Sequence, residues 1–237
     1  MPKIDIIILI YNNLIATEQC IKNLYLYTQD FRLIIFDNGS TDSTLLFLKN
    51  LSKEKDNVDF YLSRENLGII CGRNSAYEFL KNNYLVSEFL IFLDNDQIVL
   101  SGWQESYFNF FEQGYDVLGC EAWSMRNDFY PYYRCKNNED SFSYTGCGGL
   151  VIKKEVVDKI GLLDISFSPK YFEDPSFIFT AYNAGFKIGW NYENKIFHDH
   201  KGPLLNAESK KYFMSNWKKF KEKWKGYKIP VFNMGKI

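Results

Sequence analysis

The first hundred residues alternate between apolar runs typical of buried strands and segments with the apolar spacing of helices. Residues 4–10 form a continuous β-branched run, the pattern of a strand buried on both faces of a parallel sheet. Residues 14–27 have helical spacing, and Leu45, Leu46 and Leu48 lie in a second expected helix. The remaining segments expected here are strands at 33–36, 58–62 and 89–93 and a helix at 70–82. This alternation predicts βαβ units and a parallel sheet.

The second half of the chain is less regular and predicts shorter elements. Residues 124–141 are polar and aromatic without periodicity, which indicates a long loop of the kind that forms lids or binding elements. The other expected elements are helices at 103–113, 173–184 (closed by Gly185) and 207–225, and strands at 116–120, 144–152 (broken by glycines), 187–190 and 195–198.

Charge and cysteine content exclude several classes of protein. A net charge of -1 argues against a general nucleic-acid binder, which needs a broad basic surface. The five cysteines form no C-x-x-C pair, so neither a zinc site nor a disulfide framework is indicated, and reduced thiols in the cytosol are expected. No signal peptide and no apolar stretch of about 20 residues is present, so we expect a cytoplasmic protein.

Polar residues follow each of the four strands expected in the first half. Tyr11 and Asn12 follow the first strand, Asp37 follows the second, Asn66 the third and Asp94 the fourth. Ligands of open α/β sheets bind outside the carboxyl ends of the strands. The sequence therefore predicts a ligand site at this edge of the sheet.

Two aspartates and two histidines are candidate metal ligands. Asp94 and Asp96 flank Asn95 directly after the fourth expected strand. Two carboxylates at this spacing can bind Mg²⁺ or Mn²⁺, which share their ligand shell with substrate phosphates. His198 and His200 are the only histidines and would face one side of an extended chain, so that one imidazole could complete a shell suited to Mn²⁺. The alternative is a hydrogen-bonded structural histidine.

Glu173 and Asp174 stand before Pro175, where a helix is expected to begin. One interpretation makes Asp174 the N-cap, with Pro175 at the first helical position. The other makes Asp174 a general base at a helix N-terminus facing a cleft, although the helix dipole would lower its pKa. Arg73 begins the helix expected at 70–82, where backbone amides and its guanidinium could bind a phosphate together; the alternative is a surface arginine.

Gly148, Gly149 and Trp123 are three further candidate site residues. Gly148 and Gly149 either form a strand bulge or allow the backbone to approach an acceptor closely. Trp123 offers an aromatic face on which a sugar can stack.

In their order along the chain, these motifs resemble the family 2 glycosyltransferases over residues 3–202. The motifs that carry the resemblance are Ile8-Leu9-Ile10-Tyr11-Asn12, Asp37-Asn38-Gly39-Ser40-Thr41-Asp42, Asn66-Leu67-Gly68, Arg73-Asn74, Asp94-Asn95-Asp96, Gly148-Gly149, Tyr171-Phe172-Glu173-Asp174 and Gly185-Phe186-Lys187, with a late His-x-His-Lys-Gly. The resemblance implies the GT-A fold, an α/β fold with a Rossmann-like, mainly parallel sheet flanked by helices. Residues 1–100 would form the nucleotide-sugar-binding half, 101–202 the metal- and acceptor-binding half, and 203–237 a basic C-terminal helix.

The resemblance also implies site roles. Tyr11, Asn12 and Asp37 would hold the nucleotide base, and Asn66, Arg73, Asp94 and Asn95 would lie near the ribose and diphosphate. Asp94, Asp96 and His198 or His200 would bind Mn²⁺ or Mg²⁺, and Asp174 would be the catalytic base with Glu173 beside it. The implied reaction is inverting sugar transfer from a nucleotide-diphosphate donor, UDP-sugar being favoured. The acceptor would be a saccharide, a lipid-linked or a protein-linked glycan in bacterial surface polysaccharide or glycoconjugate assembly.

Two other functions compete with this one. A sugar-nucleotide nucleotidyltransferase would carry a Gly-rich phosphate loop after the first strand, where this chain has Tyr11-Asn12-Asn13-Leu14. A non-catalytic nucleotide- or sugar-binding module would have no reason to keep Asp94, Asp96, Asp174 and Arg73 together.

The C-terminal segment is basic and amphipathic. Residues 210–228 contain eight lysines and one glutamate, and Trp217, Phe220 and Trp224 lie on one face of the expected helix. One interpretation packs this face onto the core. The other lays the helix on an anionic membrane leaflet as a peripheral contact.

Overall fold

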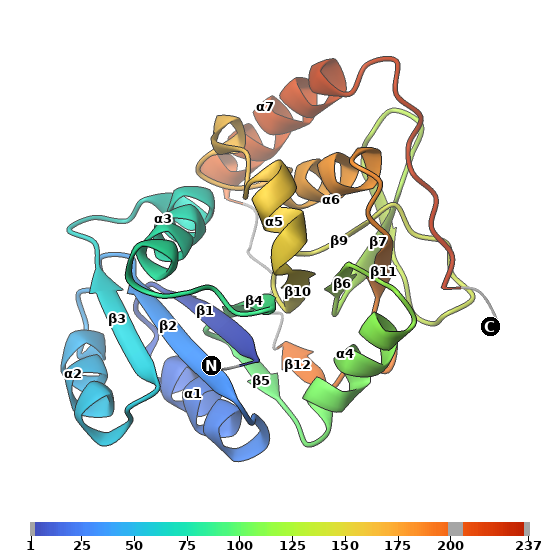
Figure 1. Cartoon of the computed structure of the whole chain (residues 1–237). Helices are drawn as coiled ribbons and strands as arrows, with labels where there is room; N and C mark the ends of the chain where they lie inside the picture. Colours follow the sequence, from blue (N-terminus) through green and yellow to red (C-terminus); the bar gives the residue numbers. More distant parts are fainter. Residues whose placement is uncertain (1–2, 199–205, 235–237) are drawn as a thin grey trace.

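A seven-stranded sheet runs through the centre of the computed structural model, which describes residues 3–198 and 206–234 (Figure 1). Its order is β11-β6-β10-β4-β1-β2-β3. The strands are β1 (Ile4–Ile10), β2 (Phe31–Asp37), β3 (Val58–Leu62), β4 (Phe89–Asp94), β6 (Val117–Gly119), β10 (Leu150–Lys153) and β11 (Ile188–Trp190). The four strands of the first half pair in parallel, which confirms the predicted parallel arrangement.

Strand β10 runs antiparallel to both of its neighbours, β4 and β6. The beginning of an antiparallel strand lies beside the end of its partner, and Leu150 accordingly pairs with Phe92 near the end of β4. The backbone N–H of Gly149 donates to the Phe92 carbonyl at 2.7 Å. The loop that leads into β10 is therefore held next to the polar end of β4.

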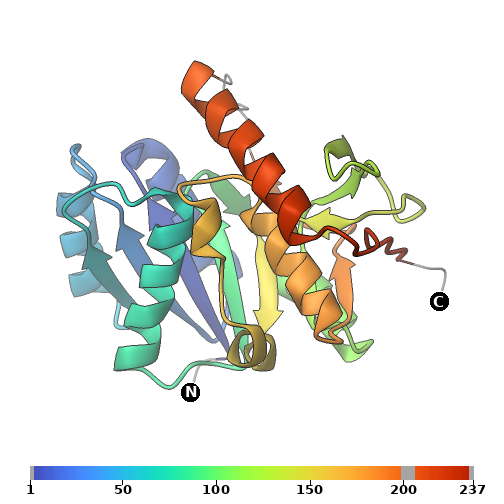
Figure 2. The same cartoon turned by 90° about the horizontal axis from the view of Figure 1, so that it is seen from above.

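Helices cover both faces of the sheet (Figure 1). One face carries α1 (Leu14–Tyr27), α2 (Thr44–Glu54) and α4 (Trp103–Glu112), and the other carries α3 (Gly68–Asn83), α5 (Lys154–Ile160) and α6 (Glu173–Asn183). The last helix, α7 (Ala207–Lys223), lies across α6 (Figure 2). No helix among residues 3–198 and 206–234 is long and apolar enough to span a membrane.

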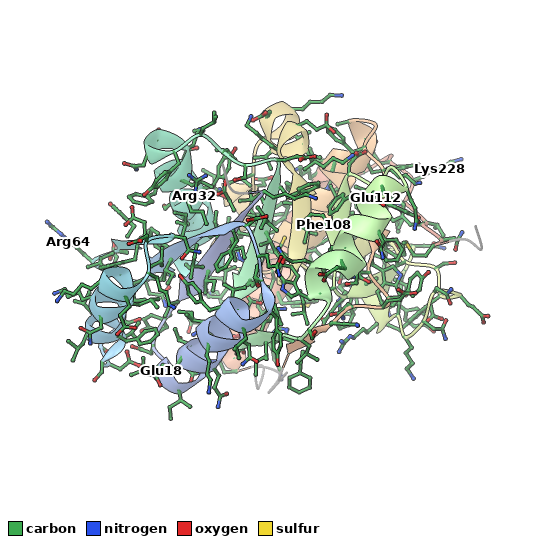
Figure 3. The ribbon with its side chains drawn as sticks, turned by 60° about the horizontal axis from the view of Figure 1, so that its bottom comes forward. Glu18, Arg32, Arg64, Phe108, Glu112 and Lys228 are labelled. Carbon is green, nitrogen blue, oxygen red and sulfur yellow. The ribbon has the colours of Figure 1, made fainter. Side chains whose placement is uncertain are left out.

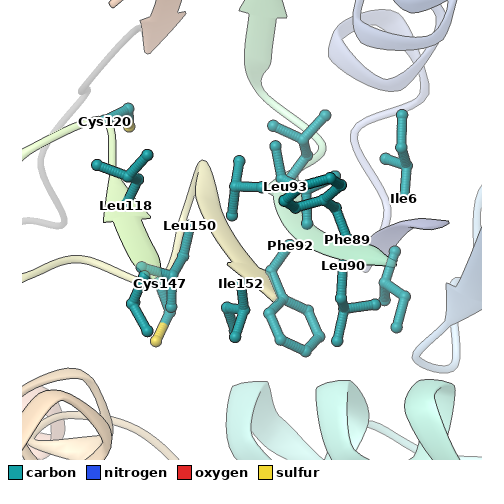
Figure 4. Close-up of a cluster of buried hydrophobic side chains, with 14 of the residues drawn as sticks. Ile6, Phe89, Leu90, Phe92, Leu93, Leu118, Cys120, Cys147, Leu150 and Ile152 are labelled. Carbon is teal, nitrogen blue, oxygen red and sulfur yellow. The ribbon is translucent and has the colours of Figure 1, made fainter. Parts of the chain in front are cut away.

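The core lies between the sheet and these helices. The central strands of the sheet are buried on both faces, as their continuous apolar runs predict. Figure 4 shows β4, β10 and β6 side by side with apolar side chains on each face. Burying one such side chain stabilises the fold by about 1.5–3 kcal/mol. Charged side chains such as Glu18, Arg64 and Lys228 point outward (Figure 3).

The second half departs from the sequence prediction in several places. The predicted loop at 124–141 contains a hairpin of β7 (Ala122–Met125) and β8 (Pro131–Arg134), which pairs further with β9 (Tyr144–Thr145). This small sheet is half exposed, with Tyr132 69% accessible, so its side chains show no clear alternation of apolar and polar residues. The single strand predicted at 144–152 is wrong, because β9 and β10 belong to different sheets. The sequence did not predict α5 or the short strand β5 (Gln97–Val99), which pairs with β12 (Ile196–His198).

Candidate active site

A cavity of about 640 Å³ opens at the end of β4. Its walls come from α3, the ends of β4 and β12, the small sheet, the loop before β10, the start of α6 and α7. The lining residues are Ile69, Arg73, Asp94, Glu121, Trp123, Pro131, Arg134, Tyr144, Gly146, Cys147, Gly148, Lys170, Tyr171, Glu173, Asp174, His198 and Phe213. It thus collects residues from both halves of the chain.

Asp94, Asp96 and His198 form a compact cluster at one end of this cavity. Asp94 is the last residue of β4, and Asp96 lies in the turn to β5. Pairing of β12 with β5 brings His198 opposite Gln97, and its Nε2 lies 3.2 Å from Asp96 Oδ1. One ligand atom from each of the three residues lies within 4.8 Å of the others. Burial would lower the pKa of His198, but the hydrogen bond with Asp96 and the charge of Asp94 raise it overall. His200 lies outside the described residues.

Arg73 supports this cluster from α3. Its side chain is buried, with the whole residue 3% accessible, and Nη2 donates to Asp94 Oδ1 at 2.5 Å. Its Nε is buried and has no hydrogen-bond partner within the described part of the chain. Burial by itself lowers the pKa of Arg73, but the charges of Asp94 and of its other acidic neighbours together raise it overall, so the guanidinium stays charged.

The prediction that the first amides of this helix are available to a phosphate is wrong. The N–H groups of Ile69 and Ile70 donate to the carbonyl of Pro169 at 3.0 and 3.5 Å. Those of Leu67 and Gly68 donate to the side-chain oxygens of Asn38 and Asn66, both at 2.8 Å. The N-terminal amides of α3 are therefore bonded within the protein, and Arg73 is the charged side chain of this helix that lines the cavity.

Glycine at position 148 makes room for Asp94. A Cβ atom on Gly148 would lie 2.3 Å from Asp94 Oδ2 and 3.2 Å from Gln97 Nε2. Gly149 does not line the cavity; it has φ +72° and packs under Cys120, whose Sγ would lie 2.6 Å from a Cβ atom there. Position 148 therefore needs glycine because the Asp94 carboxylate approaches it closely. Position 149 needs glycine because the turn into β10 has a positive φ there.

Glu173 and Asp174, at the start of α6, line the same cavity. The prediction that Asp174 is the N-cap is wrong, because the helix begins at Glu173 and the N-cap is Phe172, with φ +71°. Asp174 is half-buried, and its Oδ1 accepts the backbone N–H of Cys147 at 3.2 Å. Burial raises the pKa of Asp174 despite the hydrogen bond from Cys147 and the charge of Arg73, so it outweighs the expected effect of the helix dipole.

Glu173 is more deeply buried, and its Oε2 has no hydrogen-bond partner among the described residues. Burial, followed by the neighbouring charge of Asp174, raises the pKa of Glu173 to about 8. Two neighbouring carboxyls, one buried and one half-buried, favour a state in which one of them keeps its proton.

This raised pKa predicts a pH-dependent stability. Between about pH 5 and pH 8 the folded chain keeps a proton on Glu173 that the unfolded chain has released, so the free energy of unfolding should fall as pH rises, by up to about 1.4 kcal/mol per pH unit. Glu173→Gln should flatten this slope and raise the melting temperature at pH 8, measured by thermal denaturation across pH 5–8. The exposed Glu112→Gln is the control. An unchanged slope in Glu173→Gln would contradict the assignment.

Of the residues predicted on the nucleotide side, Arg73 and Asp94 line the cavity, whereas Tyr11, Asn12, Asp37, Asn66 and Asn95 do not. Tyr11 is 49% accessible at the end of β1, and Asn12 Oδ1 accepts the Thr41 N–H at 2.8 Å. Asp37 is buried and accepts the Ser40 N–H at 2.9 Å. Of the other two, Asn66 accepts hydrogen bonds from Gly68 and Asn38, and Asn95 donates to Asn12 and Thr17. These contacts tie the loops after β1, β2, β3 and β4 into one edge, as predicted.

Several lining residues were not predicted from the sequence. Lys170 reaches the cavity, and its Nζ donates to Ser209 Oγ of α7 at 2.9 Å. Arg134 of β8 donates to Glu121 at 2.7 Å, beside the predicted Trp123. Phe213 comes from α7. No local motif marks these residues, because they come together only through the hairpin and the docking of α7.

The aromatic face of α7 packs against the protein, as one of the two sequence interpretations proposed. Phe220 and Trp224 both pack on Phe179 of α6, with ring centroids 5.2 and 5.3 Å apart. The Trp217 Nε1 donates to the Asp128 carbonyl at 3.1 Å. These rings are thus not free to enter a membrane, and contact of the outward lysines with a leaflet stays a prediction.

Known proteins resemble the chain in sequence. The model of the family described as glycosyl transferase family 2 matches residues 5–188. A GalNAc(5)-diNAcBac-PP-undecaprenol beta-1,3-glucosyltransferase of Campylobacter jejuni is 34% identical over 108 residues, 43% of this chain and 32% of that protein. An uncharacterised glycosyltransferase of Haemophilus influenzae is 29% identical over 122 residues, 50% of this chain and 46% of that protein. The chain thus matches less than half the length of each of these relatives.

Solved structures share the fold. Residues 1–349 of TarS from S. aureus, in complex with UDP-GlcNAc, superpose with a TM-score of 0.63 at 17% identity, covering 86% of this chain and 61% of that one. GalNAc-T7 with UDP, GalNAc and Mn²⁺ gives a TM-score of 0.76 at 12% identity, covering 96% of this chain and 49% of that one. The family match, together with this likeness of fold, identifies the chain as a member of glycosyl transferase family 2 with the GT-A fold.

Proposed function

We propose that the chain transfers one sugar from a nucleoside diphosphate donor, UDP-sugar being favoured, to an acceptor hydroxyl with inversion at the anomeric carbon. One observation carries this proposal: a single cavity is lined by Asp94 and His198, two members of the Asp94–Asp96–His198 cluster, and by Glu173 and Asp174. The cluster suits a donor diphosphate, and the pair offers a carboxylate near a reacting hydroxyl. The membership of the family agrees with this chemistry.

The three clustered residues fit a divalent cation. Two carboxylate oxygens and one imidazole nitrogen, all within 4.8 Å, are a donor set suited to Mn²⁺, and Mg²⁺ accepts the carboxylates. The buried Arg73 donates a hydrogen bond to Asp94 Oδ1, and this contact fixes the orientation of the Asp94 carboxylate. When bound, the cation would neutralise charge on the leaving diphosphate. GalNAc-T7, which shares the fold, was solved with Mn²⁺ and UDP.

Asp174 is the proposed catalytic base. It is less buried than Glu173, and the Cys147 N–H holds its Oδ1, so its other oxygen can accept the proton of an acceptor hydroxyl. The hydroxyl oxygen then forms a bond to the anomeric carbon as the bond to the diphosphate oxygen breaks. Arg73 adds positive charge on the leaving-group side. One displacement by one base inverts the configuration.

The remaining roles follow the family resemblance. Tyr11, Asn12 and Asp37 are proposed for the nucleotide base, and Asn66 and Asn95 for shaping the ribose side of the same edge. Trp123 offers a ring for the acceptor sugar. The Campylobacter jejuni relative is named for an undecaprenol-linked substrate, which favours a glycan acceptor of bacterial surface polysaccharide or glycoconjugate assembly, lipid-linked or otherwise.

Gly148→Ala should weaken cation binding without unfolding the chain. The new Cβ would overlap Asp94 Oδ2 and push that carboxylate away from the cluster. A misoriented ligand typically costs 10–100-fold in metal affinity, so a loss of that order is expected in a Mn²⁺ titration followed by electron paramagnetic resonance. Gly146→Ala is the matched control, because a Cβ there meets no atom within 4 Å. Equal Mn²⁺ affinity in the two variants would refute this reading of Gly148.

The donor class can be tested by thermal denaturation with UDP, dTDP and GDP, each with and without Mn²⁺. A ligand that binds only the folded state stabilises it by about 2.7 kcal/mol at a hundredfold excess over Kd. The proposal expects a Mn²⁺-dependent stabilisation by one nucleotide, UDP first. No stabilisation by any of the three would argue against a nucleotide-sugar donor.

A further inference from the structure

We infer that Asn216 of α7 is a positioning residue: it keeps the carboxyl groups of Glu173 and Asp174 correctly placed in the cavity. This inference rests on the proposed function, which gives that pair its role. It concerns a contact from outside the region matched by the family model, which ends at residue 188.

Asn216 is bonded to the segment directly before α6. It is 1% accessible, and its Nδ2 lies 2.6 Å from the carbonyl oxygen of Phe167, 2.9 Å from that of Lys170 and 3.2 Å from that of Tyr171. Two amide protons are thus shared among three backbone carbonyl groups. In a buried setting, loss of this amide would leave those carbonyls without their donor.

The segment that Asn216 holds has an unusual backbone. Tyr171 and Phe172 have φ values of +75° and +71°, a conformation that residues with side chains rarely adopt. Two such residues in succession persist only when surrounding contacts impose them. Glu173 follows immediately, so the same two residues set the direction in which α6 begins and in which its first carboxylates point.

Other contacts of α7 hold the same segment and reach the cavity. Ser209 Oγ accepts a hydrogen bond from Lys170 Nζ at 2.9 Å, and Lys219 Nζ donates one to the Ser166 carbonyl at 2.8 Å. Phe213 lines the cavity with its ring centroid 5.7 Å from that of Tyr171. Figure 2 shows α7 lying across α6 above this region. Helix α7 therefore contacts the segment that leads into Glu173 and Asp174, and Asn216 makes the central polar contact.

Removing the Asn216 amide should affect the chemical step and spare nucleotide binding. A displacement of about 1 Å in a catalytic group can cost on the order of 100-fold in rate. Asp94, Asp96 and Arg73 make no hydrogen bond with α7 among those of the described residues, so the cation cluster should keep its geometry.

The test compares Asn216→Ala with Asn191→Ala in the full chain. Asn191 is a matched control because it is also buried and donates its amide, to Ser106 Oγ at 2.8 Å, but does not line the cavity. Two readouts are used: release of UDP from UDP-GlcNAc with Mn²⁺, and hydrogen exchange of the backbone amides of residues 168–178 by mass spectrometry. If Asn216→Ala does not fold, Asn216→Ser, which keeps one donor, replaces it.

Asn216→Ala is expected to slow UDP release by about 10- to 100-fold, with the Kd for UDP and Mn²⁺ within about twofold, and to speed exchange at 168–178. Asn191→Ala should leave both unchanged. Unchanged exchange and rate in Asn216→Ala, or equal changes in the control, would overturn the inference. If the unaltered chain releases no UDP from any UDP-sugar, the proposed function fails, whereas the exchange result still decides whether Asn216 positions the segment.

Discussion

Asp174→Asn should lower the rate of sugar transfer by on the order of 10³-fold while leaving the affinity for UDP and Mn²⁺ within about twofold. The amide keeps the size of the carboxylate and can still accept the N–H of Cys147 at its oxygen, so the start of α6 should be preserved. What is lost is the ability to take a proton from the acceptor hydroxyl. Initial rates of UDP release, paired with calorimetric titration of UDP, measure the two quantities separately.

Asp158→Asn serves as the control for this change, because Asp158 is exposed on α5 and pairs only with Lys154 in that part of the structure. Glu173→Gln distinguishes the two members of the pair, and we expect it to lower the rate less than Asp174→Asn does. A larger loss in Glu173→Gln would assign the base to Glu173. Retention of more than a tenth of the rate in Asp174→Asn would exclude Asp174 as the base.

Asp96→Ala should abolish the Mn²⁺-dependent part of UDP binding, a loss of about 100-fold in affinity. The substitution removes one of three donors from the cluster and leaves His198 without the carboxylate that lies 3.2 Å from its Nε2. Thermal denaturation with UDP, with and without Mn²⁺, measures the effect, and Asp158→Asn is again the control. If Mn²⁺ raised the melting temperature of the UDP-bound Asp96→Ala variant as much as that of the unaltered chain, the cation would bind elsewhere.

The first half of the fold could be predicted from the sequence because its elements are fully buried or regularly amphipathic. The run at 4–10 and the strand at 58–62 appear with the predicted bounds. Parallel order then brings Asp37, Asn66 and Asp94 to one edge, whichever side chains they finally contact.

The second half could be predicted only in part, because its elements are short and depend on distant partners. Strand β8 of the β7–β8 hairpin is mostly exposed, and the residues of β7 do not alternate between apolar and polar types although their burial alternates. The helix α6 begins at Glu173 as predicted, but its N-cap was misassigned: Asp174-Pro175 matches a common cap, whereas Phe172 takes the N-cap position under contacts from α7. Such contacts join residues more than forty positions apart, beyond the reach of local patterns.

The candidate site shows the same division. Asp94 and Asp96 were predicted from a motif after a buried strand, with His198 or His200 as the third ligand, and the pairing of β12 with β5 places His198 beside them. The amides at the start of α3 were predicted to bind phosphate, but the carbonyl of Pro169, a hundred residues away in sequence, occupies two of them. Lys170 and Phe213 carry no motif at all.

In the proposed reaction, one displacement at the anomeric carbon frees the nucleoside diphosphate and inverts the sugar. Proton NMR of the freed sugar tests this most directly. The unaltered chain is incubated with UDP-α-GlcNAc, UDP-α-GalNAc or UDP-α-Glc and Mn²⁺, with water as the acceptor, and the sugar is observed before its anomers equilibrate. Mn²⁺-dependent release of the β-anomer is the predicted result. Initial release of the α-anomer would contradict the single displacement, and no release from any of the three donors would contradict the UDP-sugar transferase itself.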